Sequence, residues 1–316
     1  MVGPQPFGLL FPGQGAQFAG MGRDLAQEFP RALALFQQAD DILGYEISRL
    51  CWDGPSETLT RTEHCQPALY LTSLAVIAAL ETELEARRVR PFPLAAAGLS
   101  LGEYTALAAA GALSFPNGLQ LVRLRGQAME EASRARPGTM ASVLGLELDQ
   151  VEAVCVEAGA QVANLNSPGQ IVISGTPESI TAASAKAKEK GAKRVIPLEV
   201  SGAFHSRLME PAGAQLRAAL RNLNISAPKF TVFSNVTGSP YTDAGQISTL
   251  LVDQLTRPVQ WVACVQAMLQ SGIRTFLEVG PGTVLKGLVR KIDPEVTVHS
   301  VGTAEEVRKA AALWSA

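Results

Sequence analysis

The pentapeptide Gly98-Leu99-Ser100-Leu101-Gly102 follows a run of small apolar residues, 93–97, and precedes a run of good helix formers, 103–110. A short buried strand, a sharp turn and a helix are predicted here, which is the setting of a nucleophile elbow. Glycines let such a turn close, and a helix N-terminus stabilises negative charge beside the serine. The pattern predicts that Ser100 is a nucleophile. The plainer interpretation is a loop that only caps a helix.

Composition narrows the class of protein. The formal net charge of -2 over 316 residues argues against a general binder of nucleic acids or anionic membranes. Four dispersed cysteines fit free thiols in a reducing cytosol better than a disulfide framework or a zinc site. The N-terminus lacks the basic segment of a signal peptide, and the longest apolar run, 68–80, is too short to span a bilayer. We therefore expect a cytoplasmic protein without a metal site.

Three segments share the order strand, glycine-rich turn and helix, and they begin at the predicted strands 7–11, 93–97 and 274–279. This repetition predicts a mostly parallel sheet with functional loops at its carboxyl edge. Between residues 137 and 200 the order changes to strand, helix, strand, strand, helix and strand, which is typical of a ferredoxin-like unit. The sequence thus predicts an α/β fold with a large subdomain, 1–136 and 201–316, and an inserted small subdomain, 137–200.

Capping and proline signals place the other elements. A helix is predicted over 30–43, a second from Gln66-Pro67 to about residue 87, and a third from Ser114 to about residue 133. Strands are predicted over 229–236 and 296–299. The loop after the first strand is not a dinucleotide-binding loop, because Phe18 stands where a third glycine is needed.

Three histidines could serve Ser100 as a base: His64, His205 and His299. His205 is favoured because it lies in a Gly/Ser loop at a strand end, at the junction of the two subdomains. Gln14, in the tight loop after the first strand, carries an amide that could donate to an oxyanion. Its plainer interpretation is a turn residue that bonds its own loop.

The helix over 114–133 carries two arginines that face different ways. Arg125 lies adjacent to its apolar face, whereas Arg123 points about 200° away at 100° per residue. A lone arginine on a helix is usually a solvated charge, so the pattern alone does not assign Arg125 a function.

Eight motifs occur together along the chain: FPGQGAQ at 11–17, QPAL at 66–69, GLSLGEY at 98–104, RG at 125–126 with Met129, NSPGQ at 166–170, GAFHS at 202–206, PVQW at 258–261 and EVGPG at 278–282. In this order the chain resembles the malonyl-CoA:acyl carrier protein transacylases of fatty acid synthesis and the related acyltransferase domains of polyketide synthases. The resemblance covers nearly the whole chain and implies an α/β-hydrolase-like core with a ferredoxin-like insertion.

The resemblance also implies the roles of the reacting groups. Ser100 would be the acylated nucleophile and His205 its base. The oxyanion hole would come from the backbone N–H of Leu101 and from Gln14. The backbone carbonyl of Gln254, in place of an acid, would orient His205.

The substrate pocket follows from the same resemblance. Arg125 would bind the malonyl carboxylate, and Gln66, Asn166, Phe204 and Leu99 would line the pocket. Phe204 before the histidine is the form that the family associates with malonyl. Leu99 departs from the family, which usually has histidine there, so the shape of the acyl pocket is the property in question.

The implied activity is ping-pong transfer of a malonyl group from malonyl-CoA to the phosphopantetheine thiol of holo acyl carrier protein, without cofactor, metal, nucleic acid or membrane. The alternatives are a trans-acting polyketide acyltransferase and a serine thioesterase or acyl hydrolase that uses His299. Carrier proteins are acidic, so a basic docking patch is expected, with these candidates: Lys186, Lys188, Lys190, Lys193, Arg194, Lys286, Arg290 and Lys291.

Overall fold

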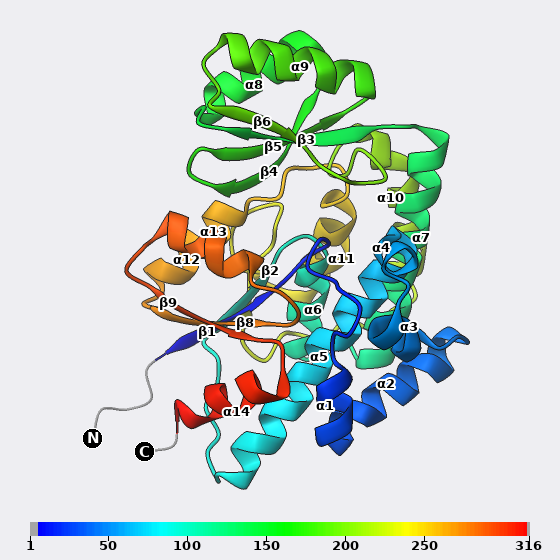
Figure 1. Cartoon of the computed structure of the whole chain (residues 1–316), viewed down its shortest axis with the longest axis vertical. Helices are drawn as coiled ribbons and strands as arrows, with labels where there is room; N and C mark the ends of the chain where they lie inside the picture. The colour runs from blue at the N-terminus through cyan, green and yellow to red at the C-terminus, as the bar shows by residue number, and fades with distance from the viewer. Residues whose placement is uncertain (1–5, 315–316) are drawn as a thin grey trace.

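Two β-sheets lie one above the other along the long axis of the protein (Figure 1), and the computed structural model describes residues 6–314. The larger sheet has the strand order β7-β2-β1-β8-β9, and every neighbouring pair is parallel. Its strands are β1 (Phe7–Phe11), β2 (Ala95–Gly98), β7 (Thr231–Val232), β8 (Thr275–Val279) and β9 (Thr297–Val301). The predicted α/β class with a mostly parallel sheet is confirmed.

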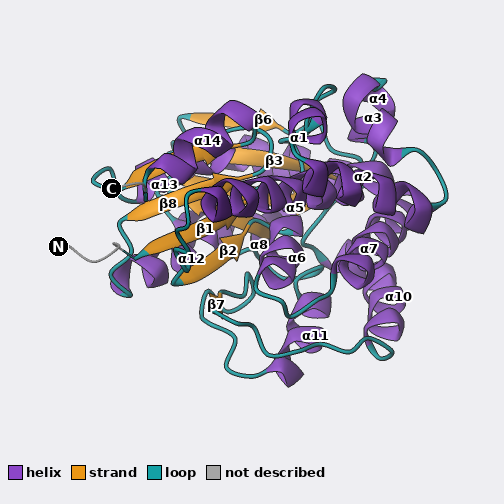
Figure 2. Ribbon diagram, turned by 90° about the horizontal axis from the view of Figure 1, so that it is seen from below, coloured by secondary structure: helices purple, strands orange, loops and turns teal. Residues whose placement is uncertain are grey.

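Helices cover both faces of this sheet (Figures 1 and 2). On one face lie α5 (Thr62–Ala86) and α14 (Ala304–Ala312), and on the other α12 (Trp261–Gln270) and α13 (Val284–Ile292). Successive residues of β1 serve the two layers: Leu9 and Phe11 join the core cluster that contains α5, and Leu10 joins the cluster of α12 and α13. A strand buried on both faces must be apolar throughout, as β1 is.

The other helices of the larger unit gather to one side of the sheet (Figure 2). They are α1 (Arg23–Glu28), α2 (Pro30–Leu43), α3 (Ile47–Asp53), α4 (Ser56–Thr60), α6 (Leu101–Ala109), α7 (Phe115–Ala135), the 3₁₀ turn η1 (Arg207–Met209), α10 (Glu210–Leu220) and α11 (Ala244–Asp253). The predicted bounds of α2 are confirmed, and Ser114 caps α7 by accepting from the Asn117 N–H at 3.3 Å.

Helix α5 is longer than predicted. It starts at Thr62, four residues before Gln66, because the Arg61 carbonyl accepts from the N–H groups of His64 and Cys65 at 2.9 and 2.8 Å. Pro67 therefore lies inside the helix and does not open it. By length and composition α5 could cross a membrane, but 67% of its apolar window is buried inside the fold, as in a core helix.

The smaller sheet is antiparallel, with strand order β4-β5-β3-β6. Along the chain its elements are β3 (Thr139–Leu144), α8 (Leu148–Ala158), β4 (Gln161–Ser167), β5 (Gln170–Gly175), α9 (Pro177–Glu189) and β6 (Arg194–Pro197). The two helices cover the face of the sheet that points away from the larger unit (Figure 1), and a separate apolar cluster lies beneath them. The predicted order of elements over this segment is observed.

The segment between α11 and α12 ties the two sheets together. The Val259 N–H donates to the Ala163 carbonyl at 2.8 Å, and its own carbonyl accepts from the Leu165 N–H at 2.9 Å. Strand β4 also packs against α12 and α13. The edge strand of one sheet is thereby fixed over the helices of the other.

Two strand predictions were inaccurate. The strand expected over 229–236 is limited to β7, because the chain turns back and the Ser234 N–H donates to the Ser239 carbonyl at 2.9 Å. Asn235 leaves the strand direction and bonds the elbow instead, as described below. The last strand runs to Val301 and not to His299, since its whole length pairs with β8.

The elbow closes through two glycines. Ser100 has a φ of 52°, a left-handed conformation that is rare for a residue with a side chain. A Cβ on Gly98 would overlap the carbonyl group of Gly102, and a Cβ on Gly102 would overlap the carbonyl oxygen of Phe11. Any other residue at either position would force the turn apart.

We therefore expect Gly102→Ala to lower the free energy of unfolding by about 3 kcal/mol, because backbone atoms cannot yield as a side chain does. Gly287 in α13 is a matched control, since nothing lies within 4 Å of its added Cβ. Gly287→Ala should raise stability by about 0.5–1 kcal/mol through helix propensity. Urea unfolding of both variants measures the difference, and equal effects would contradict the close packing of the elbow.

Candidate active site

Ser100 and His205 meet at the carboxyl edge of the larger sheet. The Ser100 Oγ lies 2.9 Å from Nε2 of His205, and Nδ1 of His205 lies 2.7 Å from the backbone carbonyl of Gln254. A carbonyl only accepts, so Nδ1 carries the proton and Nε2 is free to accept from the serine hydroxyl. The pair therefore has the geometry of a nucleophile and its base, with a carbonyl in place of the usual acid.

The surroundings keep His205 neutral. The residue is buried, and burial together with the nearby Arg125 charge lowers its pKa to about 4, against the effect of the Gln254 hydrogen bond. Burial is the larger cause, since a charged imidazole loses its hydration there. A neutral imidazole at physiological pH can take the serine proton.

Arg125 lies next to the nucleophile and not on the surface. Its side chain is 1% exposed. The guanidinium donates through Nη2 to Ser100 Oγ at 3.0 Å and to Gln254 Oε1 at 2.8 Å, and through Nη1 to Gln66 Oε1 at 2.8 Å. It also lies 5.2 Å from the centre of the Tyr104 ring.

All three acceptors of the guanidinium are neutral. Within residues 6–314 no carboxylate forms an ion pair with Arg125, and its buried Nε has no hydrogen-bond partner. Burial accordingly lowers the pKa of Arg125. A buried cation held only by neutral groups is suited to receive an anion.

A cavity of about 160 Å³ opens at Ser100 between the two sheets. The predicted site residues that line it are Gln14, Leu99, Ser100, Leu101, Arg125, Asn166, Phe204 and His205. Gln66 and Gln254 lie behind Arg125 and hold it. Met140 and Val172 of the smaller sheet close the other side. The cavity has room for a short acyl group beside Ser100.

Two backbone N–H groups are free at this cavity. Leu101 is the first residue of α6, and neither its N–H nor that of Gln14 has an acceptor in the part of the chain that the structure describes. The amide of Gln14, the group expected to face an oxyanion, points instead to Thr62 and donates to its Oγ1 at 3.4 Å. In this structure the backbone N–H of Gln14 is the free donor at the cavity, and the role of the residue in an oxyanion hole stays a prediction.

Gly13 explains how the Gln14 loop approaches the elbow. A Cβ at this position would overlap the Leu99 carbonyl oxygen. The Leu99 N–H in turn donates to the Phe11 carbonyl at 3.1 Å. The loops after β1 and β2 are thus packed backbone against backbone, which brings the two free N–H groups to one cavity.

Sequence reasoning missed the residue that braces the elbow, Asn235. Its Oδ1 accepts from the Ser100 N–H at 2.7 Å and its Nδ2 donates to the Gly98 carbonyl at 2.8 Å. The side chain bonds both sides of the turn and stabilises the strained serine. The available signal was an amide side chain within a predicted buried strand, since a buried amide needs hydrogen-bond partners. Asn235 is indeed fully buried in the structure.

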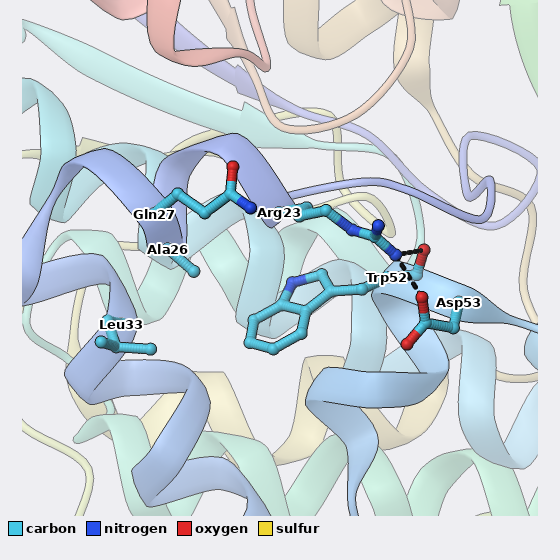
Figure 3. Close-up of a pocket in the computed structure, with 6 residues that line it drawn as sticks. All are labelled: Arg23, Ala26, Gln27, Leu33, Trp52 and Asp53. Atoms are coloured by element: carbon cyan, nitrogen blue, oxygen red, sulfur yellow. Dashed lines mark hydrogen bonds and ion pairs between the residues drawn. The ribbon is translucent and has the colours of Figure 1, made fainter.

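The other two histidines lie elsewhere. His64 contacts the Tyr45 hydroxyl through Nδ1 at 3.3 Å. His299 lines a separate cavity with Lys286 and Lys309, away from Ser100. A third cavity, near α1 and α3, contains an Arg23–Asp53 ion pair beside Trp52 but no nucleophile and base (Figure 3).

Comparison with known proteins agrees with this geometry. Residues 9–311 match the acyl transferase domain family. The chain is 45% identical over 306 residues to the malonyl CoA-acyl carrier protein transacylase of Bacillus subtilis, covering 95% of each protein. The chain belongs to this transacylase family. Its members are acyltransferases, and the cavity at Ser100, His205 and Arg125 is the candidate acyl-transfer site.

Solved structures of the family superpose closely on the chain. The malonyl CoA-acyl carrier protein transacylase of Coxiella burnetii gives a TM-score of 0.93 at 38% identity, covering 99% of both chains. A type II polyketide synthase acyl-carrier protein in complex with its malonyl-transacylase gives a TM-score of 0.92 at 37% identity, covering 97% of this chain and 99% of that one.

The environment of His205 predicts an unusual pH profile. Acylation of Ser100 by acetyl-CoA in a single turnover should stay constant between about pH 8 and pH 5, because the base is already neutral. It should fall with a midpoint near the His205 pKa of about 4. Arg125→Ala removes one cause of the lowered pKa, so its midpoint should move upward. A midpoint near the ordinary histidine value in both proteins, with the fold checked by circular dichroism, would contradict the burial of His205.

Proposed function

We propose that the protein transfers the malonyl group from malonyl-CoA to the phosphopantetheine thiol of holo acyl carrier protein through a malonyl ester of Ser100. The observation that carries this proposal is Arg125, a buried guanidinium that touches the nucleophile and lacks a carboxylate partner among the described residues. A cation at this place recognises an acyl group that ends in a carboxylate. The names of the relatives agree with that choice of acyl group.

In the first half-reaction, Nε2 of His205 takes the Ser100 proton as Oγ attacks the thioester carbon of malonyl-CoA. The tetrahedral oxyanion accepts hydrogen bonds from the backbone N–H groups of Leu101 and Gln14, each worth about 3 kcal/mol in such sites. The carbon–sulfur bond then breaks. Coenzyme A leaves with the proton that His205 held, and the malonyl ester remains on Ser100.

In the second half-reaction the carrier thiol gives its proton to His205, and its sulfur attacks the ester carbon. The same two N–H groups stabilise the second oxyanion. The ester bond breaks, and Ser100 Oγ recovers the proton from His205. No group besides the thioester, the thiol and these side chains enters the proton balance, so the cycle needs no cofactor.

The pocket residues shape the acyl group that is accepted. Arg125 would pair its planar fork with both malonyl carboxylate oxygens while Gln66 and Gln254 hold it in place. Leu99 and Phe204 offer apolar walls to the methylene carbon. Asn166 Oδ1 is buried without a hydrogen-bond partner, which suits an amide N–H of the pantetheine arm.

We further propose a division into a large catalytic subdomain, 1–136 and 201–316, and a small subdomain, 137–200. Support comes from the two separate sheets and from an apolar cluster confined to the smaller one. The parallel sheet with its nucleophile after β2 suits an α/β-hydrolase-like core. The strand order β4-β5-β3-β6 with two helices on one face suits a ferredoxin-like unit.

We place the docking surface for the acidic carrier on α13 and the adjoining hairpin between β4 and β5. Of the expected basic residues, Lys186 and Lys190 are already paired with Glu157, at 2.8 and 3.2 Å. Among the described residues the other candidates form no ion pair: Lys188, Lys193 and Arg194 of the small unit and the cations of α13. We favour α13 because its Lys291 donates to Gln170 of the hairpin at 2.9 Å, which joins the two surfaces. The four cysteines are buried free thiols, which agrees with a cytoplasmic protein.

The carrier could belong to fatty acid or to polyketide synthesis. The similarity to a chain from the complex of a type II polyketide carrier with its malonyl-transacylase favours testing both, by comparing kcat/KM for the two holo carriers. The hydrolase alternative loses its proposed base, because His299 lines a different cavity from Ser100.

Ser100→Ala should abolish the malonyl-enzyme, seen as loss of the mass increase after incubation with malonyl-CoA. His205→Ala should slow transfer to holo carrier protein by roughly 10²–10⁴-fold, the usual contribution of a positioned base. His299→Ala is the matched control and should leave transfer nearly unchanged. A persistent mass increase in the serine variant, or a larger loss at His299, would overturn the assignment.

Arg125→Ala should lose malonyl transfer selectively and keep or gain acetyl transfer. Breaking a buried charge pair costs about 3–5 kcal/mol, or roughly 10²–10³-fold or more in kcat/KM. Arg125→Lys should restore malonyl transfer only in part, since an ammonium cannot donate two parallel hydrogen bonds. An unchanged ratio of kcat/KM for malonyl-CoA and acetyl-CoA would refute the role of Arg125.

A further inference from the structure

A buried carboxyl group lies on the far side of Gln254 from Arg125. Glu103 is the third residue of α6 and is 0% exposed. Its two oxygens accept hydrogen bonds from the Tyr241 hydroxyl and from Nε2 of Gln254. The other amide atom of Gln254, Oε1, accepts from Nη2 of Arg125 at 2.8 Å. Carboxylate, amide and guanidinium therefore form one hydrogen-bonded row.

This row gives the buried guanidinium its counter-charge. Burial lowers the pKa of Arg125, and Tyr104 and then the Glu103 carboxylate act against that lowering. The two ions do not touch, and the Gln254 amide between them is oriented with its N–H toward the anion and its oxygen toward the cation. Isolated buried charges are costly, so the ionised Glu103 carboxylate lowers the cost of burying the Arg125 charge.

The same glutamine also positions the base and the nucleophile. Its backbone carbonyl accepts from Nδ1 of His205 at 2.7 Å, and its Nε2 donates to the Ser100 carbonyl at 2.9 Å. A group that fixes Gln254 therefore acts on the reaction without touching the substrate.

We propose that Glu103 is a positioning residue that balances the charge of Arg125 through Gln254, and that the malonyl carboxylate competes with Glu103 for that charge. The inference rests on the proposed function. In the empty site the ionised Glu103 carboxylate balances the Arg125 guanidinium. When malonyl binds, two carboxylates share one guanidinium, and protonation of Glu103 restores the balance. Neutral Glu103 thus favours malonyl, and ionised Glu103 reduces its advantage over acetyl.

The titration of Glu103 falls in a useful range. Burial raises its pKa to about 7, against the lowering effect of the hydrogen bonds from Tyr241 and Gln254. Rising pH ionises Glu103, which adds a negative charge near the malonyl carboxylate and weakens malonyl binding. The preference for malonyl over acetyl should therefore fall as pH rises through about 7.

The other titratable groups around Glu103 keep one charge state over this range. Burial raises the pKa of Tyr104, on the same helix, to about 12, and those of Tyr241 and of Cys264 of α12 are also raised strongly. The pKa of His205 is lowered to about 4. Arg125 of α7 stays protonated, as arginine does in proteins. A midpoint near neutrality in the preference for malonyl therefore reports Glu103.

The test is the ratio of kcat/KM for malonyl-CoA to that for acetyl-CoA between about pH 6 and pH 9 in the wild type and two variants. The thiol and phosphates of coenzyme A and the His205 base are common to both substrates and cancel in the ratio. In the wild type we expect the ratio to fall about tenfold, since coupling of one pKa unit corresponds to a factor of 10. Glu103→Gln should give a ratio that does not change with pH.

Tyr241→Phe is the matched variant, since it keeps the carboxyl group and removes one hydrogen bond that lowers its pKa. Its profile should keep the fall but shift the midpoint to higher pH, which a merely structural role would not do. If Glu103→Gln fails to fold, the pH profiles of the wild type and of Tyr241→Phe still test the role of Glu103.

Two results separate this inference from the proposed function. If the wild type forms no malonyl-enzyme at any pH, the proposed function fails. If it transfers malonyl but the ratio is flat with pH, or if Glu103→Gln keeps the wild-type midpoint, only the role of Glu103 is overturned.

Discussion

A guanidinium buried beside a serine, with only neutral groups in contact, is the constraint on which this site depends. Transfer of an isolated charge into the interior would be prohibitive, so the fold surrounds Arg125 with acceptors from several elements. Gln66 comes from α5, Ser100 from the elbow and Gln254 from the end of α11. Each of these elements is held in place by the need to satisfy the same cation. The position of Arg125 and its acceptors therefore determines the arrangement of the site more than the apolar wall of the cavity does.

The backbone of the elbow carries a second constraint. Ser100 and His205 both have positive φ, 52° and 57°, so both residues are held in a backbone conformation that is rare for residues with a side chain. The strain persists because surrounding hydrogen bonds over-determine it: Asn235 bonds both sides of the serine turn, and Gln254 fixes the imidazole. The hydrogen bonds that satisfy these buried polar groups are therefore the same ones that hold Ser100 and His205 in position.

Much of this arrangement could be predicted from the sequence, for physical reasons that differ by element. The predictions of strand β1 and helix α2 were accurate because the signals for both elements, apolar pattern and end residues, lie within the local sequence. The start of helix α5 was predicted four residues too late. Proline is common in the first turn of a helix but does not define it, and the first hydrogen bonds of α5 are accepted by the Arg61 carbonyl. The contact of the Gln14 side chain with Thr62 could not be predicted, because the two residues are distant in sequence.

The residues that sequence reasoning did not single out, Asn235 and Glu103, share one property. Each is fully buried and polar, and each forms hydrogen bonds to a segment more than a hundred residues away, Asn235 to Ser100 and Glu103 to Tyr241. Local periodicity reports burial and capping but not which distant partner satisfies a buried polar group. Ser100 and His205 could be singled out because the serine stands in a Gly-x-Ser-x-Gly turn and the histidine is one of three in the chain, whereas a buried amide or carboxyl group has many possible partners.

Leu99, where the family usually has histidine, shows why the fold tolerates that departure. What the turn requires of this residue comes from its backbone: the N–H bonds the Phe11 carbonyl, and the carbonyl oxygen lies where Gly13 leaves room for it. The side chain packs beside the cluster of α12 and α13 and lines the acyl cavity. A leucine there adds no hydrogen-bonding group that could compete with Arg125 for a carboxylate. The substitution therefore alters the cavity wall and leaves in place both the backbone contacts of the elbow and the Arg125 guanidinium.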